Sequence, residues 1–300
     1  MKKITHIIFS GHAMRSLNLL GILRYLYFYN LHNDIKSIIG TSMGSFFGLA
    51  LTLKIPFEDL EQYIKKIINN EDIMSIKTDQ ISNLFINNGI DKTSNYLIYL
   101  KEFIKKKYDI EDITFIELAK KTGIDFNVST TNVNNYKNYI FNLTNTPNVS
   151  VFDAVSASMT LPFLSQPVLI DGYYYIDGGI TNNFPIELYN NIPVENILSV
   201  ITIIEDHYED IIPKNNNINF YDYSLRILNF LIINTTVTML TTKINKNKNN
   251  NILIIDKSSV LSLNVEINNN NIHKKMSIDD VDKLIFEGYK YIFDYMKQFE

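Results

Sequence analysis

The sequence contains no cysteine among its 300 residues. This absence excludes disulfide bonds, thiolate metal sites and a cysteine nucleophile. Long apolar runs are also missing, because asparagines and threonines interrupt even the segment 227–240, and a membrane span needs ~20 apolar residues. The apolar part of the N-terminus is too short for a signal peptide. We therefore expect a cytoplasmic protein, with peripheral contact to a membrane left open.

An excess of positive charge is missing as well. The chain has 28 Lys and Arg against 32 Asp and Glu, so the formal net charge is −4. Because nucleic-acid binding requires a basic surface, we expect no nucleic-acid partner. The basic run 105–107 is interpreted as a solvated helix face, and a patch for anionic lipid is the alternative. The oligomeric state cannot be read from the sequence.

The order of apolar segments indicates an α/β fold. Strand-like segments at 4–9 and 35–39 enclose a helical segment at 14–29, which is a βαβ unit. Strands alternating with helices predict a mostly parallel central sheet with helices on both faces. We find neither a repeat nor a linker and expect one domain over residues 1–300. Further strands are predicted at 126–130, 139–143, 173–176, 198–204 and 252–255, and further helices within 57–122, at 152–159, at 223–242 as a buried helix, and from 277 to about 297.

The segment Gly40-Thr41-Ser42-Met43-Gly44 is the most informative motif of the chain. It follows a predicted strand and precedes a predicted helix, which is the setting of a G-x-S-x-G nucleophile elbow. The glycines permit a sharp turn, and N–H groups at the start of the helix can stabilise an oxyanion. An ordinary glycine-rich turn between a strand and a helix is the alternative interpretation.

A base for Ser42 has two possible sources. Of the five histidines only His207 and His273 follow the serine, and neither lies beside a recognisable motif, so a conventional α/β-hydrolase triad is disfavoured. Asp177 ends a predicted strand and precedes Gly178 and Gly179. A desolvated carboxylate can accept the serine proton directly. A structural aspartate in a turn is the alternative.

The loop 10–16 joins the first predicted strand to the first predicted helix. In a parallel sheet it would lie beside the elbow, where its backbone N–H groups can contact a tetrahedral intermediate. Arg15 would hold this loop or attract phosphate, although a plain surface arginine is an equal explanation.

Together these motifs resemble the patatin-like phospholipase family, over about residues 4–186, with residues 187–300 completing the domain. Gly11, Arg15 and Gly21 match its glycine-rich loop, the segment 40–44 its elbow, and the segment 177–179 its D-G-G motif. The segment 154–163 is also similar to the family sequence before the aspartate. The resemblance implies Ser42 as nucleophile, Asp177 as base, oxyanion donors at Gly11, His12, Ala13 and Met43, supporting roles for Arg15, Gly40, Gly44, Gly178 and Gly179, and neither metal nor cofactor.

The predicted function is a lipid acyl hydrolase of the phospholipase A or lysophospholipase type. Its partner would be a phospholipid or another acyl lipid, and we expect activity without calcium. One departure from the family matters, because His12, Ala13 and Ser16 stand where the family has glycines. This departure motivates one alternative, a catalytically weak lipid-binding scaffold. A transacylase, which passes the acyl group to an alcohol, is the other alternative.

Overall fold

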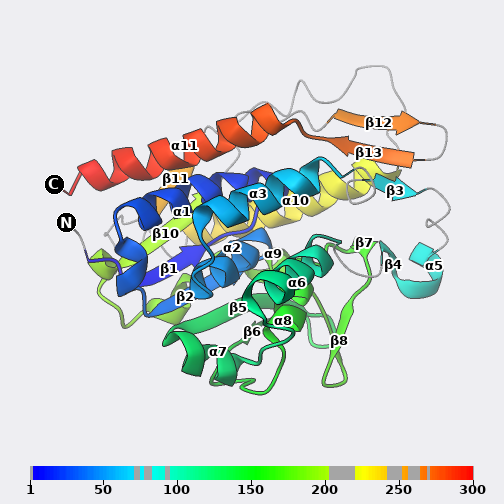
Figure 1. Cartoon of the computed structure of the whole chain (residues 1–300). Coiled ribbons are helices and arrows are strands. Elements are labelled where there is room, and N and C mark those ends of the chain that lie inside the picture. The colour runs from blue at the N-terminus through cyan, green and yellow to red at the C-terminus, as the bar shows by residue number, and fades with distance from the viewer. Residues whose placement is uncertain are drawn as a thin grey trace.

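A mixed, mostly parallel sheet forms the centre of the molecule (Figure 1). The computed structural model describes residues 3–70, 75–77, 83–91, 95–202, 220–241, 252–255, 264–268 and 271–299. The strands of this sheet are β1 (His6–Phe9), β2 (Ser37–Thr41), β5 (Asp125–Asn132), β6 (Lys137–Phe141), β8 (Val168–Ile170), β9 (Tyr173–Asp177), β10 (Ile197–Thr202) and β11 (Ile252–Ile255). Their order is β11-β10-β1-β2-β5-β9-β8, and β6 pairs with β5. The strands from β11 to β5 are parallel, whereas β6, β8 and β9 pair antiparallel.

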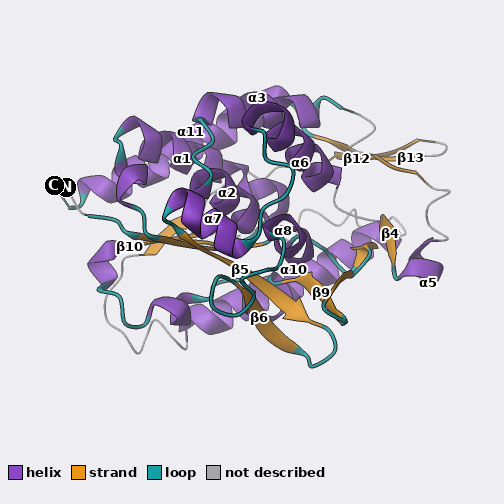
Figure 2. Ribbon diagram, turned by 60° about the horizontal axis from the view of Figure 1, so that its bottom comes forward, coloured by secondary structure: helices purple, strands orange, loops and turns teal. Residues whose placement is uncertain are grey.

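Helices cover both faces of this sheet (Figure 2). The α-helices are α1 (Asn18–Phe28), α2 (Met43–Thr52), α3 (Phe57–Ile68), α5 (Asn83–Asn87), α6 (Asn95–Tyr108), α7 (Phe115–Thr122), α8 (Val151–Ser158), α9 (Gly179–Asn182), α10 (Phe220–Met239) and α11 (Ile278–Lys297). Short 3-10 helices are η1 (Ala13–Leu17), η2 (Leu31–Asp34), η4 (Ile186–Tyr189) and η5 (Val194–Asn196).

Alternation along the strands produces two apolar layers, because successive strand residues point to opposite faces. Ile7 and Ile38 belong to the larger core, which also contains buried residues of α1, α2, α3 and α11. Ile8 and Ile39 belong to a second core, against which Leu240 packs at the end of α10. The sequence patterns therefore gave the right fold class, with helices on both faces of a mostly parallel sheet.

The segment 57–122 is less helical than the sequence predicts. It contains α3, α6 and α7, but also the short strands β3 (Ser75–Lys77) and β4 (Gly89–Asp91). Strand β3 pairs with β13 (Asn271–Lys275), which also pairs with β12 (Asn264–Asn268). Strand β4 pairs with β7 (Phe163–Ser165). Because these partners are distant in the chain, local sequence patterns do not reveal the strands.

The prediction of a buried helix at 223–242 is right about the helix and wrong about its burial. Helix α10 buries Ser224, Leu228 and Thr236 on one face. Its other face is exposed, with Tyr223 54% and Phe230 63% accessible. An apolar sequence without a strong helical periodicity does not indicate which face of the helix packs against the protein. Neither α10 nor any other helix in the described ranges is long and apolar enough to cross a membrane.

Candidate active site

Two strands bring the predicted nucleophile and base together by sharing one edge of β5. Strand β2 pairs with this edge up to Thr41 opposite Ser129, and β9 begins its pairing with Asp177 opposite Thr130. Strand β6 occupies the other edge at these positions. Because β2 and β9 run in opposite directions, their carboxyl ends meet head to head. Ser42, one residue past β2, therefore faces the last residue of β9.

The two side chains are in direct contact. Ser42 Oγ donates a hydrogen bond of 2.6 Å to Asp177 Oδ2. The other carboxylate oxygen, Oδ1, accepts the N–H of Gly179 at 2.7 Å. Both oxygens of Asp177 are thus oriented, and one is directed at the serine hydroxyl. The catalytic roles of Ser42 and Asp177 stay predictions, but the contact that they require is present.

Burial sets the acidity of the predicted base. The Asp177 side chain is 0% exposed, and this burial raises the pKa of its carboxyl group to about 6. The hydrogen bonds from Ser42 and Gly179 oppose the shift because they stabilise the charged form. A carboxylate with this pKa is a better proton acceptor than an exposed aspartate and is still mostly ionised at neutral pH.

The backbone of the elbow is strained at the serine. Ser42 has φ 53° and ψ −130°, a region that residues other than glycine rarely occupy. Such strain is expected at the serine of a nucleophile elbow. Gly44 allows the elbow to pack closely against β1, since a Cβ at this position would lie 2.2 Å from the carbonyl oxygen of Phe9. Gly40 lies in β2, on the strand side of the same turn.

Ser158, at the end of α8, connects the elbow to β5 through two hydrogen bonds. The N–H of Ser42 donates to Ser158 Oγ at 2.8 Å, and Ser158 Oγ donates to the carbonyl of Ser129 at 2.6 Å. This chain of two bonds fixes the nucleophile to β5. The sequence analysis did not assign Ser158 a role, although it lies in the segment 154–163 that resembles the family. The D-G-G glycines are close by, because Gly178 packs against the carbonyl of Ser129.

The predicted oxyanion loop lies beside the elbow, but two of its N–H groups are already bonded. The N–H of Gly11 donates to Asn183 Oδ1 at 2.9 Å, and Asn183 Nδ2 donates back to the Gly11 carbonyl at 3.0 Å. The N–H of His12 donates to Ser16 Oγ at 2.7 Å. An oxyanion role for Gly11 and His12 would therefore require these bonds to open. The sequence reasoning missed both Asn183 and the hydroxyl of Ser16.

The other predicted oxyanion donors, Ala13 and Met43, are each the first residue of a helix. Ala13 and Arg15 lie in η1, where the N–H of Arg15 donates to the carbonyl of His12 at 3.1 Å. Met43 is the first residue of α2, and the first N–H groups of a helix have no acceptor within the helix. The oxyanion roles of Ala13 and Met43 stay predictions.

The histidines give no support to a conventional triad. Burial, and secondarily the charge of Arg15, lowers the pKa of His12 to about 3, so this ring is neutral at physiological pH. His273 lies in β13, in a sheet separate from the central one. His207 falls outside the described residues. Within the described residues, no group of three or more His, Cys, Asp and Glu side chains is arranged to hold a metal.

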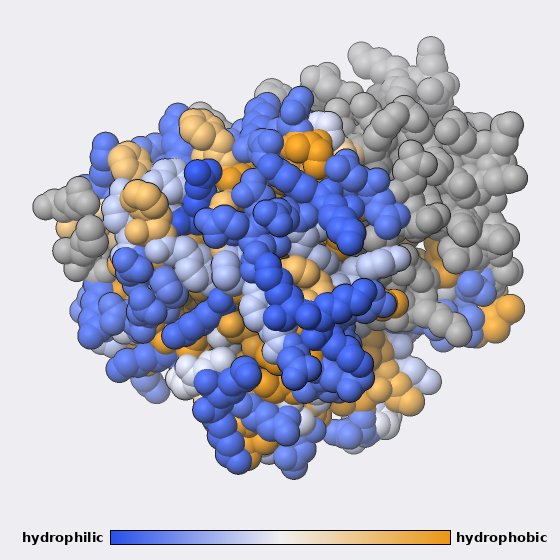
Figure 3. Space-filling view, in the orientation of Figure 1, coloured by the Kyte–Doolittle hydropathy of each residue, from blue (hydrophilic) through white to orange (hydrophobic). Residues whose placement is uncertain are grey.

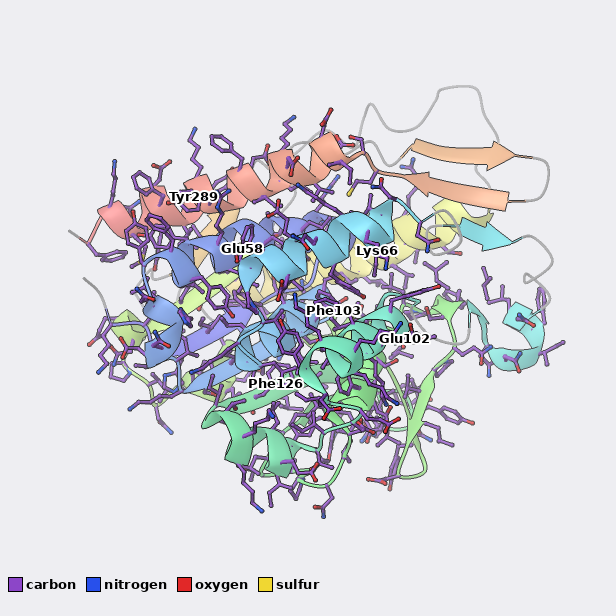
Figure 4. The ribbon with its side chains drawn as sticks, viewed as in Figure 1. Glu58, Lys66, Glu102, Phe103, Phe126 and Tyr289 are labelled. Atoms are coloured by element: carbon purple, nitrogen blue, oxygen red, sulfur yellow. The ribbon has the colours of Figure 1, made fainter. Side chains whose placement is uncertain are left out.

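A groove of about 600 Å³ lies between α3 and α6, where Figure 4 labels Lys66, Glu102 and Phe103. Phe103 and Tyr63 form part of its lining, and their rings lie 5.0 Å apart. Charged side chains, among them Lys66 and Glu102, surround these rings. None of the predicted site residues lines this groove.

The α/β fold and the contact between an elbow serine and a buried aspartate are those that the resemblance to a family of lipid acyl hydrolases implies. The family model described as patatin-like phospholipase matches residues 7–189, so the chain belongs to this family of lipid acyl hydrolases. The predicted family and enzyme class are thereby confirmed.

Individual proteins agree with this assignment. The chain is 28% identical over 239 residues to the "Probable lipid hydrolase 463L" of Invertebrate iridescent virus 6, covering 77% of this chain and 78% of the relative. It is 25% identical over 274 residues to protein R571 of Acanthamoeba polyphaga mimivirus, covering 88% and 85%. VipD from Legionella pneumophila has a similar structure, with a TM-score of 0.57 and 13% identity over 99% of this chain and 67% of VipD. This last likeness shows the fold alone.

Proposed function

We propose that this protein hydrolyses fatty-acyl esters of phospholipids or lysophospholipids through Ser42 and Asp177. The 2.6 Å hydrogen bond between the serine hydroxyl and the buried carboxylate is the observation that supports this most directly. Both groups lie at the carboxyl ends of strands, where α/β proteins usually place their active sites.

In the proposed mechanism Asp177 takes the proton of Ser42 while Oγ attacks the ester carbonyl. The tetrahedral intermediate collapses, and the leaving alcohol takes the proton from Asp177. Water then attacks the acyl-enzyme, with Asp177 as base again. The fatty acid leaves, and Ser42 recovers its proton. The N–H groups of Met43 and Ala13 are the proposed oxyanion donors, because those of Gly11 and His12 are engaged.

Removal of either dyad member tests the proposal most severely. We expect Ser42→Ala and Asp177→Asn each to lower kcat by about 10³-fold or more, measured as fatty-acid release from phospholipid micelles. Ser156→Ala is a matched control, because Ser156 is a buried serine of α8 whose Oγ has no hydrogen-bond partner in the described structure. Full activity of Ser42→Ala would refute the proposed nucleophile.

The raised pKa of Asp177 predicts the pH dependence. Only the ionised carboxylate can accept the serine proton, so kcat/KM should rise with pH and level off above the pKa of about 6. The profile should be measured from pH 4.5 to 8 with a soluble p-nitrophenyl ester. A profile that is flat down to pH 4.5 would contradict a base with this pKa.

The engaged loop donors favour one other candidate, a weakly catalytic lipid-binding scaffold. The bonded N–H groups of Gly11 and His12 leave fewer donors for an oxyanion. A fluorophosphonate probe separates the two functions, since it labels Ser42 only where that serine is a working nucleophile. Tight lipid binding without labelling would favour the scaffold.

A further inference from the structure

Helix α10 runs from the middle of the sheet past the dyad. At its end, Leu240 packs on the core formed by Ile8 and Ile39, in the middle of their strands. One turn earlier, Thr236 Oγ1 accepts a hydrogen bond of 3.1 Å from Asn183 Nδ2, beside the loop that follows β1. Another turn earlier, Ile232 packs on Gly179, next to Asp177. The N-terminal half of α10 therefore extends beyond the carboxyl edge of the sheet, on the dyad side.

This extended half exposes large apolar side chains. On its outer face Ile227 is 42%, Phe230 63% and Leu231 41% accessible, and Tyr223 one turn earlier is also exposed. The neighbouring face of the helix, which is turned toward the protein, is buried at Ser224 and Leu228. Single exposed apolar residues are ordinary, but a row of them along one helix face indicates an interaction site.

The β8–β9 hairpin, like the N-terminal half of α10, extends beyond the carboxyl edge of the sheet. The carbonyl of Tyr174 accepts the N–H of Val133, which lies just past the end of β5, so the hairpin projects beyond the carboxyl edge. Leu169, Tyr173 and Tyr174 are exposed on it. Figure 3 shows the contrast on the visible face, which is mostly hydrophilic over α6 and α7 and apolar in places beside β7 and β8.

These two elements carry little net charge. Asp222 and Arg226 are the charged residues of α10 and are of opposite sign, and Asp171 is the sole charged residue between 166 and 176. The basic run of α6 is different, because Lys105 pairs with Glu111 and Lys107 with Asp59. Hydrophobic insertion is therefore favoured over electrostatic attraction to anionic lipid.

We propose that the outer face of α10 around Ile227 and Phe230, together with the β8–β9 hairpin, is a lipid-docking surface that seats the protein on its substrate. The occupant is a lipid surface, because both elements project on the side of Asp177, expose large apolar side chains and carry little net charge. This inference rests on the proposed function. Seated in this way, the dyad faces the layer from which an acyl ester must enter.

The test measures co-sedimentation with phosphatidylcholine vesicles. The double variant Ile227→Asp/Phe230→Asp should lower the partition coefficient at least tenfold and keep its rate on a soluble p-nitrophenyl ester. The matched control is Phe286→Asp, because Phe286 is equally exposed (67%) but lies on α11, on the opposite face of the sheet. This control should bind vesicles like the wild type. Binding of the wild type should also survive 0.5 M NaCl.

Three outcomes would overturn the proposal. The first is that the double variant binds vesicles as well as the wild type, and the second is that high salt abolishes binding. The third is that light scattering finds a dimer for the wild type and a monomer for the double variant, which would identify a second copy as the occupant. The Ser42→Ala variant keeps the two proposals apart. It should bind vesicles normally, and if it retained full ester hydrolysis, the proposed nucleophile would fail without affecting the docking result.

Discussion

Two neighbouring turns at the carboxyl edge of the sheet differ in how their backbone donors are used. Strands β1 and β2 are paired in register, with Phe9 opposite Gly40, so the loop after β1 and the elbow after β2 lie side by side. The elbow passes directly into α2, whose first N–H groups have no acceptor within the helix. In the loop, the N–H groups of Gly11 and His12 are bonded to Asn183 and Ser16.

The difference lies in which backbone groups the remote contacts engage. In the elbow, Ser158 accepts the N–H of Ser42, 116 positions away, and the N–H groups at the start of α2 have no acceptor within the helix. The loop depends on Asn183, which is 172 positions away in the sequence and fully enclosed. We therefore expect both turns to respond to changes at remote residues, the loop at Asn183 and the elbow at Ser158.

Among changes that test this comparison of the two turns, the contact between them gives the largest expected effect. A Cβ at Gly11 would lie 2.5 Å from Ser42 Cβ and 2.7 Å from the carbonyl oxygen of Thr41. Gly11→Ala must therefore push the loop and the serine apart. Since a displacement of about 1 Å can cost about 10²-fold in rate, we expect a loss of that order in kcat on a soluble ester.

Gly123→Ala is the control for this variant. Gly123 has φ 71° and open space around a Cβ, so alanine there strains the backbone at the end of α7 without touching the dyad. It should cost about 1 kcal/mol of stability and no activity. Normal activity of Gly11→Ala would show that the two turns are not as tightly packed as the structure indicates.

Asn183→Ala removes both hydrogen bonds between Asn183 and Gly11, and we expect the next largest effect from it. It leaves the N–H and carbonyl of Gly11 buried without their partner, which should lower the free energy of unfolding by about 3 kcal/mol. Urea denaturation measures this loss, and we expect kcat to fall by about tenfold as the loop loosens. Asn182→Ala is the matched control. That side chain is also buried, but it bonds to Glu187 and Phe184 and does not contact the loop.

The sequence predicted the elbow, the aspartate motif and the parallel core because each is encoded by adjacent residues. Asn183 lies four residues after that motif, but it is one of 38 asparagines, so nothing in the sequence distinguishes it from neutral surface positions. Ser158 and Ser16 act through single hydroxyls whose partners are set by tertiary contacts. The exposed face of α10 was missed because an apolar helix is predicted to be buried when the elements that pack against it are not known.

The smallest expected effect separates two explanations of the engaged loop. Ser16→Ala removes the acceptor of the His12 N–H, which can then turn toward a developing oxyanion. Because an added donor stabilises the transition state, we expect kcat on a soluble ester to rise, by no more than about fivefold since the freed N–H is not preorganised. Ser16→Gly removes the same hydroxyl and should give the same sign. A fall in kcat for both variants would mean that Ser16 holds the loop in its working conformation, and the loop would then resemble the elbow in being built for catalysis as it stands.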